Sequence, residues 1–148
     1  EAPESPPPFD PAEIMELENL GAWKHWAEFN FEKLILRANL ERSGNYPLPL
    51  IKALAFVGDH FTQEIHLGDA AESARVSEAH LSRLFSEHLK ISFSDYLTEL
   101  RISEAERLLK KPGLTVKEIA YAVGYQDPNY FSKSFKKIKG LVPRESRK

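Results

Sequence analysis

The sequence predicts an all-α fold, in which two pairs of helices are joined by one long helix and preceded by a further helical segment. Three observations lead to this prediction. Start and stop signals for helices follow one another closely from residue 67 onward. Two segments of the chain repeat each other at a spacing of 50 residues. No segment shows a β-strand pattern of comparable strength.

Capping residues mark where the helices are expected to begin. The residues with side chains suited to a helix N-terminus are Ser77, Ser92, Thr115 and Asp127. Asp95 and Glu118 each stand three positions after one of these caps and form capping boxes with it. Pro128 follows Asp127 at the favoured first helical position. Helices are therefore expected over residues 48–61, 68–74, 78–89, 93–110, 115–122 and 128–139.

The N-terminal part of the chain has a different composition. Residues 1–11 carry five prolines and are expected to form an extended linker. Residues 12–45 are expected to be helical and are dense in apolar side chains, including Trp23 and Trp26. Because a lone helix does not expose so much apolar surface in water, this segment is expected to pack within the chain, to form a homodimer through residues 12–43, or to dock onto a further domain. The absence of an initiating Met favours a piece of a longer protein.

Overall composition excludes several classes of protein. Apolar residues make up 42% of the chain and aromatic residues 11%, which is enough for a packed core. No apolar run approaches the ~20 residues of a membrane-spanning helix, and no signal-peptide pattern opens the chain. Cysteine is absent, which rules out disulfides and thiolate metal sites. These features are typical of a cytoplasmic protein and predict no membrane association in this fragment.

Charge is distributed unevenly along the chain. Residues 1–66 hold 5 basic and 11 acidic side chains, a net −6, and residues 67–100 hold 3 and 6, a net −3. Residues 101–148 hold 12 and 5, a net +7. This asymmetry favours an anion-binding C-terminal end, with a solvated basic tail as the simpler alternative.

The internal repeat lies in the second helix of each pair. Segments 80–85 and 130–135 both read ring, apolar, Ser, base, variable, Phe. The apolar residue and the final Phe lie four positions apart on one helix face and are expected to anchor that helix to the core. Tight turns at Arg75-Val76 and at Gly124 separate the helices of each pair. The pairs are therefore expected to be helix-turn-helix units, the first unit over residues 67–89 and the second unit over residues 115–139.

Anchoring of these helices determines which residues face outward. The outward positions near the start of each second helix are Ala79, Ser82 and Arg83 in the first unit, and Pro128, Asn129, Ser132 and Lys133 in the second. Hydroxyl, amide and basic groups suit base edges and phosphates in a DNA major groove, where a helix-turn-helix places the start of its second helix. The connecting helix over 93–110 spans roughly 27 Å at ~1.5 Å per residue. This length suits two DNA-contacting helices, one in each unit, that lie about one duplex turn apart. An ordinary helical bundle with polar outer faces is the alternative, and two matching units disfavour it.

Several of these segments resemble one family. The matching strings are residues 119–125 (IAYAVGY), 130–137 (YFSKSFKK) and 140–143 (GLVP) in the second unit, and residues 93–97 (FSDYL) after the first. With them, residues 67–148 resemble the AraC/XylS-type DNA-binding domain, and residues 101–109 resemble its linker helix. The resemblance implies two helix-turn-helix subdomains and a role in the control of bacterial transcription.

The resemblance also implies sites and partners. The base-reading positions of the family fall on Ala79, Ser82, Arg83, Pro128, Asn129, Ser132 and Lys133, and backbone contact is expected at Lys136 and Lys137. Double-stranded DNA and RNA polymerase are the implied partners, with activation favoured over repression. The resemblance implies that such a domain is the output domain of a larger regulator, which also has a ligand-binding or receiver domain. The sequences of residues 93–97 and 125–133 are most similar to those of family members fused to receiver domains. A helix-turn-helix module used mainly for protein–protein interaction is the alternative.

The sequence departs from the family pattern in the first unit. Arg75 and Lys90 stand where the family often has Gly. Ala79 and Ser82 offer little hydrogen bonding, and residues 67–100 are acidic. The second unit is therefore expected to supply more of the affinity for DNA.

No enzymatic site can be assembled from the sequence. The chain lacks a Cys nucleophile and a Gly-rich phosphate loop. His60 and His66, with Asp59 or Glu64 nearby, match no standard spacing of metal ligands. No catalytic residue, metal or cofactor is expected.

Overall fold

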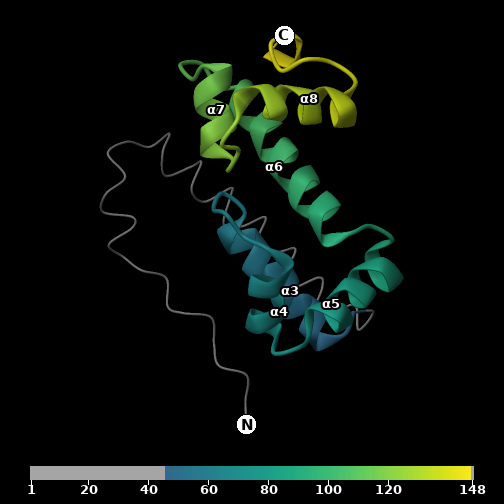
Figure 1. The fold of residues 1–148 in the computed structure, drawn as a ribbon. Helices are drawn as coiled ribbons and strands as arrows, with labels where there is room; N and C mark the ends of the chain where they lie inside the picture. The colour runs from purple at the N-terminus through teal and green to yellow at the C-terminus, as the bar shows by residue number, and fades with distance from the viewer. Residues whose placement is uncertain (1–45, 148) are drawn as a thin grey trace, which may run out of the picture. The chain divides into compact units, whose positions relative to one another are not determined.

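Residues 46–147 are described by a computed structural model (Figure 1). They contain helices and no strands, which confirms the all-α prediction for this part of the chain. The helices are α3 (Leu48–His60), α4 (Leu67–Ala74), α5 (Glu78–Leu84), α6 (Phe93–Leu109), α7 (Val116–Ala122) and α8 (Pro128–Lys139), with a π-helical turn η1 (Phe85–Leu89) and a 3-10 turn η2 (Glu145–Arg147). The predicted linker over 1–11 and the apolar segment over 12–45 lie outside the described residues.

Two of the predicted capping interactions are complete. The Thr115 hydroxyl accepts a hydrogen bond from the Glu118 backbone N–H at 3.1 Å, and the Glu118 carboxylate accepts one from the Thr115 N–H at 2.7 Å. The Thr115 hydroxyl also donates to the Glu118 carboxylate at 2.7 Å. The two bonds that this carboxylate accepts lower the pKa of Glu118 below its usual value, with the backbone bond as the larger cause. Ser77 caps α5 by accepting from the His80 N–H at 3.1 Å. The starts of α5 and α7 are thus set by local sequence.

The other two caps bond in slightly different ways. The Asp127 carboxylate accepts from the Asn129 N–H at 2.8 Å and starts α8 as expected. The Ser92 hydroxyl accepts from the Asp95 N–H at 3.1 Å and donates to the Asp95 carboxylate at 2.8 Å. The reciprocal bond of this cap therefore runs through the Ser92 hydroxyl and not through its backbone N–H.

Helix α3 covers the first unit. It packs against α4 and α5, and its buried side chains include Leu50 and Val57. Ala70 and Leu81 are fully buried on α4 and α5. The small Ala70 side chain permits close approach of the helices.

The second helix of the first unit is not one α-helix over 78–89 as predicted. The α-helix ends at Leu84 and continues as η1, which closes at Lys90 in the left-handed conformation (φ 60°). Phe85, the first residue of η1, is fully buried and packs edge-on against Phe93 and Tyr96, each with ring centroids 5.7 Å away. An α-turn and a π-turn differ only in the carbonyl that each N–H reaches, so apolar spacing over five residues does not distinguish them.

The second unit has its own core on the C-terminal half of α6. The buried residues of this core are Ile102, Ala105, Leu109, Ile119, Ala120, Val123, Tyr125, Phe131 and Phe135. Phe131 and Phe135 are fully buried and lie on one face of α8, with ring centroids 5.8 Å apart. The predicted anchoring pair is thereby confirmed.

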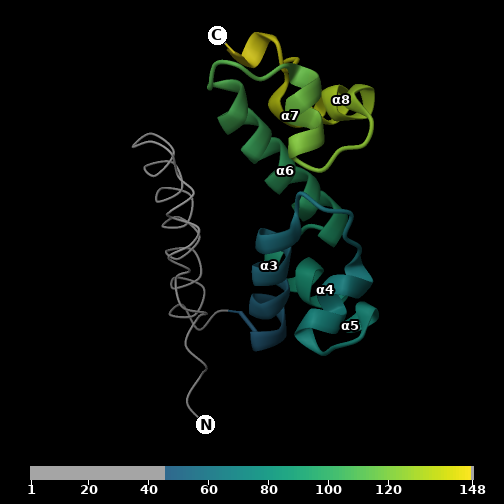
Figure 2. The same ribbon diagram turned by 90° about the vertical axis from the view of Figure 1, so that its left-hand side faces the viewer.

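Helix α6 connects the two units. Its first residue, Phe93, packs against the first unit, and Ile102 to Leu109 belong to the second core. Both ribbon views show α3, α4 and α5 toward the start of α6 and α7 and α8 toward its end (Figure 2). The observed bounds Phe93–Leu109 agree with the predicted 93–110 to within one residue. No helix in the described part of the chain is long and apolar enough to cross a membrane.

Replacing Arg75 with Gly is expected to raise the free energy of unfolding by up to about 1 kcal/mol. Arg75 ends α4 in the left-handed conformation (φ 57°, ψ 44°), which strains a residue with a Cβ, and its side chain is exposed. The measurement is urea denaturation of the whole chain. Ser73→Gly, at an exposed helical position of α4, is the control and should lower stability by about 0.5 kcal/mol. A loss of stability in Arg75→Gly would show that its side chain holds the turn.

Candidate nucleic-acid interface

The predicted reading residues of the first unit lie on the open face of α5. Ala79, Ser82 and Arg83 are all exposed, while Leu81 and Leu84 on the opposite face are buried. The outward direction predicted for these three side chains is therefore confirmed. Only Arg83 among them carries a long hydrogen-bonding group, so the face offers base edges few donors.

Acidic side chains surround this first reading face. Glu78 at the start of α5 and Glu87 within η1 are exposed. Because DNA phosphates are negative, these carboxylates oppose the attraction of Arg83.

The second unit presents a richer set of polar groups. Asn129 and Lys133 are exposed on the N-terminal half of α8, and Pro128 and Ser132 are half-buried. The Ser132 hydroxyl donates to the Pro128 carbonyl at 3.0 Å within the helix. The hydroxyl proton is therefore committed, and Ser132 presents mainly an acceptor. Asn129 is left as the amide best suited to a base edge, because Asn can bond two groups of one base.

Basic side chains continue along α8. Lys133, Lys136 and Lys137 are exposed, and none of them forms an ion pair with a residue in the described part of the chain. Lys139 differs from them, because its ammonium bonds the Glu106 carboxylate of α6 at 2.5 Å and lowers the pKa of that carboxyl. The exposed lysines give α8 a positive surface that α5 lacks.

Two exposed rings flank the predicted reading residues. His80 and Tyr130 occupy the same place in the repeat, directly before the buried anchor of each helix, and Tyr130 is 64% exposed. Both rings lie at the start of a reading helix, where a helix-turn-helix approaches DNA. The matched ring position in segments 80–85 and 130–135 is the sequence signal that points to them.

The histidines considered as metal ligands have local roles instead. The His60 ring bonds the Phe56 carbonyl through Nδ1 at 2.9 Å and stacks on the Phe56 ring. His66 lies 3.6 Å from the Asp69 carboxylate at the start of α4. Across residues 46–147, no group of three or more His, Cys, Asp or Glu side chains is placed to hold a metal ion.

Comparison with known proteins gives a consistent assignment. A family model described as a helix-turn-helix domain matches residues 70–148. The HTH-type transcriptional regulator GlxA of Rhizobium meliloti is 42% identical over 78 residues, which are 53% of this chain and 24% of GlxA. The HTH-type transcriptional activator RhaS of Salmonella paratyphi B is 33% identical over 115 residues, 77% of this chain and 41% of RhaS. The chain thus spans less than half the length of these relatives.

A solved structure agrees with the fold. The C-terminal domain of AraT, a response regulator from Geobacillus stearothermophilus, is 37% identical with a TM-score of 0.66, and the match covers 68% of this chain and 84% of that domain. GlxA and RhaS are regulators of transcription, and AraT is a response regulator. The chain belongs to the AraC-type helix-turn-helix family of DNA-binding transcriptional regulators.

Proposed function

We propose that this chain binds specific duplex DNA sequences with α5 and α8 and regulates transcription, with activation as the favoured outcome. The observation that carries the proposal is the pair of helix-turn-helix units, each with the outer face of its second helix open to solvent. RhaS, which is similar over 77% of the chain, is a transcriptional activator. RNA polymerase is the proposed partner in activation.

Each reading helix has a defined part in this mechanism. The start of α8 enters one major groove, where Asn129 and Lys133 contact base edges, and Ser132 accepts a hydrogen bond. Lys136 and Lys137 lie further along the same helix and contact phosphates. The start of α5 enters a neighbouring groove, with Arg83 as its main contact and Ala79 and Ser82 as small groups against the bases.

The second unit supplies most of the affinity. Its reading helix carries exposed lysines and no acidic residue within Pro128–Lys139. The first reading helix presents Arg83 between Glu78 and Glu87. Attraction to phosphate dominates the affinity of most DNA-binding proteins, so the charge difference decides in favour of α8.

The domain belongs to a larger regulator. We assign residues 46–148 to its output domain, residues 1–11 to a linker, and residues 12–45 to a dimer or packing segment. The AraT domain supports the role of an output domain because it is the C-terminal part of a response regulator.

The test of this proposal is selection of duplexes from a random DNA pool by the 148-residue chain. We expect enrichment of sites with two short conserved blocks about one helical turn apart. The control is the double variant Arg83→Ala with Lys133→Ala, in which the enrichment should disappear. A folded chain that enriches no site would contradict the proposal and favour a module for protein–protein interaction.

The lysines assigned to phosphates give a separate prediction. Replacing Lys136 and Lys137 with Ala should lower the slope of log affinity against log salt concentration by about 2, because about 0.9 ion is released per phosphate contact. Affinity should fall by a similar factor for specific and random duplexes. Salt titrations of both duplexes measure this effect, with Lys117→Ala on α7 as the control for an exposed lysine elsewhere. Loss of discrimination between the two duplexes would instead place these lysines on bases.

A further inference from the structure

The side of α6 between the two units carries an arginine that bonds to the α3–α4 loop. The Arg101 Nε donates to the Phe61 carbonyl at 2.7 Å, and its Nη2 donates to the Gln63 carbonyl at 2.7 Å. The planar guanidinium holds two carbonyls in fixed directions, which an ammonium cannot do. Because this loop connects α3 to α4, which is the first helix of the first unit, Arg101 holds the start of that unit against the middle of α6.

The same guanidinium also faces the second unit. It lies over the Tyr125 ring with its carbon 5.8 Å from the ring centroid. Tyr125 is 7% exposed and belongs to the second core. The Tyr125 hydroxyl makes no hydrogen bond of normal geometry. Burial raises the pKa of this hydroxyl, and the nearby Ser134 side chain offsets part of the rise. Arg101 therefore contacts the backbone of the α3–α4 loop, which precedes the first unit, and the Tyr125 ring in the core of the second unit.

Gly124 allows the two units to approach at this point. A Cβ on Gly124 would lie 2.9 Å from the Phe61 carbonyl oxygen, 3.0 Å from the Thr62 carbonyl oxygen and 3.0 Å from the Arg101 Nε. Two of these neighbours are backbone atoms, which do not move easily. The turn of the second unit thus needs Gly for its positive φ of 96° and also for direct contact with the α3–α4 loop.

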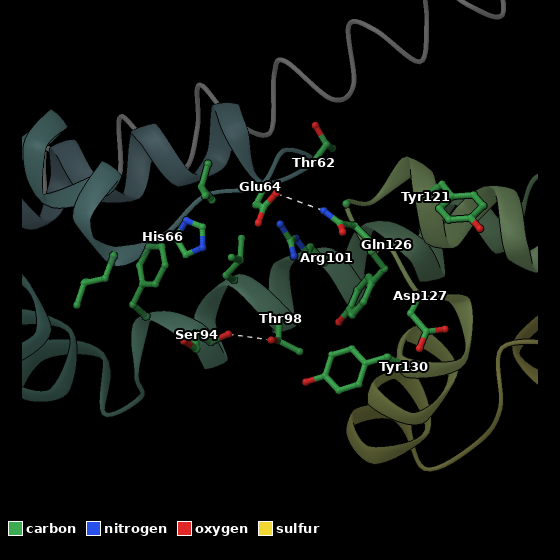
Figure 3. A pocket seen from close by; sticks show the side chains of 16 residues that line it. Thr62, Glu64, His66, Ser94, Thr98, Arg101, Tyr121, Gln126, Asp127 and Tyr130 are labelled. Atoms are coloured by element: carbon green, nitrogen blue, oxygen red, sulfur yellow. Dashed lines mark hydrogen bonds between the residues drawn. The ribbon is translucent and has the colours of Figure 1, made fainter.

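A side-chain bond extends this contact. The Gln126 amide donates to the Glu64 carboxylate at 3.3 Å, again from the α7–α8 turn to the α3–α4 loop. Figure 3 shows Arg101 between the loop that bears Thr62 and Glu64 and the turn that bears Gln126. We name Arg101, Gly124, Gln126 and the carbonyls of the α3–α4 loop the inter-unit clasp.

We propose that the inter-unit clasp fixes the orientation of α5 relative to α8, with Arg101 as its positioning residue, so that the protein accepts operators of one block spacing only. This inference rests on the proposed function and adds a determinant of specificity that does not itself contact DNA. Without the clasp, the units would be joined by α6 and its apolar contacts, and such contacts are non-directional and would permit rotation of one unit against the other. The directional bonds of Arg101 prevent that rotation.

The geometry of DNA makes spacing a sensitive readout. One added base pair moves a block by ~3.4 Å and rotates it by about one tenth of a turn. Two rigidly joined readers gain from simultaneous binding only when their geometry matches both blocks, whereas loosely joined readers tolerate several spacings. Loosening the clasp should therefore reduce discrimination between spacings and not only affinity.

The test uses the duplex selected above together with duplexes whose spacing is changed by one or two base pairs. We expect the unmodified chain to prefer the selected spacing by about tenfold or more, and Arg101→Ala to reduce this preference to about threefold or less. Arg101→Lys keeps the charge but not the two directed bonds and should also lose preference. Lys110→Ala, which removes an exposed cation near the end of α6, is the control and should keep it.

The possible results separate the two proposals. Equal weakening of all spacings by Arg101→Ala, or no spacing preference in the unmodified chain, would overturn the clasp while the proposed function stands. If the unmodified chain binds no duplex, the proposed function fails. A purely stabilising role of Arg101 would lower the unfolding midpoint without changing the ratio between spacings.

A second measurement needs no DNA. The chain contains no cysteine, so spin labels can be attached at Ser73→Cys on α4 and Lys117→Cys on α7, which are both exposed positions. We expect one narrow distribution of label distances in the unmodified background and a broader one with Arg101→Ala or Gln126→Ala. Identical narrow distributions in all three proteins would overturn the proposal even if a variant changed DNA affinity.

Discussion

Replacing Phe131 with Ala is expected to lower the free energy of unfolding by about 3–5 kcal/mol, the range typical of a large-to-small change at a buried Phe. Phe131 is fully buried, and its ring centroid lies 5.3 Å from that of Tyr125 and 5.8 Å from that of Phe135. Removing the ring leaves a cavity where α8 meets its core. Because small domains are stable by only about 5–15 kcal/mol, the second unit should unfold at much lower urea concentration.

Tyr130→Ala is the matched control for this experiment. Its ring belongs to the adjacent residue of the same helix and is 64% exposed, with a tilted contact to Tyr125 at 6.0 Å. We expect a loss of no more than about 1 kcal/mol, the scale of one aromatic contact. Urea denaturation followed by circular dichroism compares the two variants. Equal losses would show that the anchoring role of the buried ring has been misassigned.

The helix boundaries were largely predictable because they depend on local chemistry. Each helix start is marked by two residues close together in the sequence, as by Thr115 with Glu118 and by Asp127 with Pro128. The structure confirms both helix starts. The anchors were predictable because the repeat placed Phe131 and its counterpart at the same position in both units. Local signals of this kind do not depend on how distant segments meet.

Features that depend on distant segments were not predictable. Nothing in the sequence around Arg101 indicates that it bonds carbonyls 40 and 38 positions earlier in the chain. Gly124 was explained as a turn residue, and its close contact with the Phe61 carbonyl becomes visible only when the fold is known. The π-turn after Leu84 was not predictable for another reason, since the spacing of apolar residues over five positions does not distinguish a π-turn from an α-turn.

The reading residues stand between these two cases. Their outward direction followed from the anchoring pattern, and the exposure of Arg83, Asn129 and Lys133 agrees with it. The sequence did not predict that the Ser132 hydroxyl would donate to the Pro128 carbonyl and so lose its donor. Contact of any of these residues with bases stays a prediction. Because the two units differ in charge, the loss of DNA affinity on reversing one charge in each unit is the most direct test of their contributions.

Reversing the charge of Lys133 is expected to weaken binding to the selected duplex by about 100-fold or more, whereas reversing that of Arg83 should weaken it by about tenfold. Lys133→Glu removes a contact at the start of α8 and places a carboxylate against the phosphates. Arg83→Glu adds a carboxylate to a helix on which Glu78 and Glu87 are already exposed, so the first unit has less attraction to lose.

Both positions are exposed, so the two variants should unfold at the same urea concentration as the unmodified chain, and fluorescence anisotropy at fixed salt can compare their affinities directly. A larger loss in Arg83→Glu than in Lys133→Glu would assign the main contact to the first unit. The acidic side chains around α5 would then have to point away from DNA. Exposed carboxylates near phosphates lower the affinity for DNA unless salt screens the charges fully. The order of the two losses therefore decides which helix supplies the affinity and which supplies only a second, weaker check on the sequence.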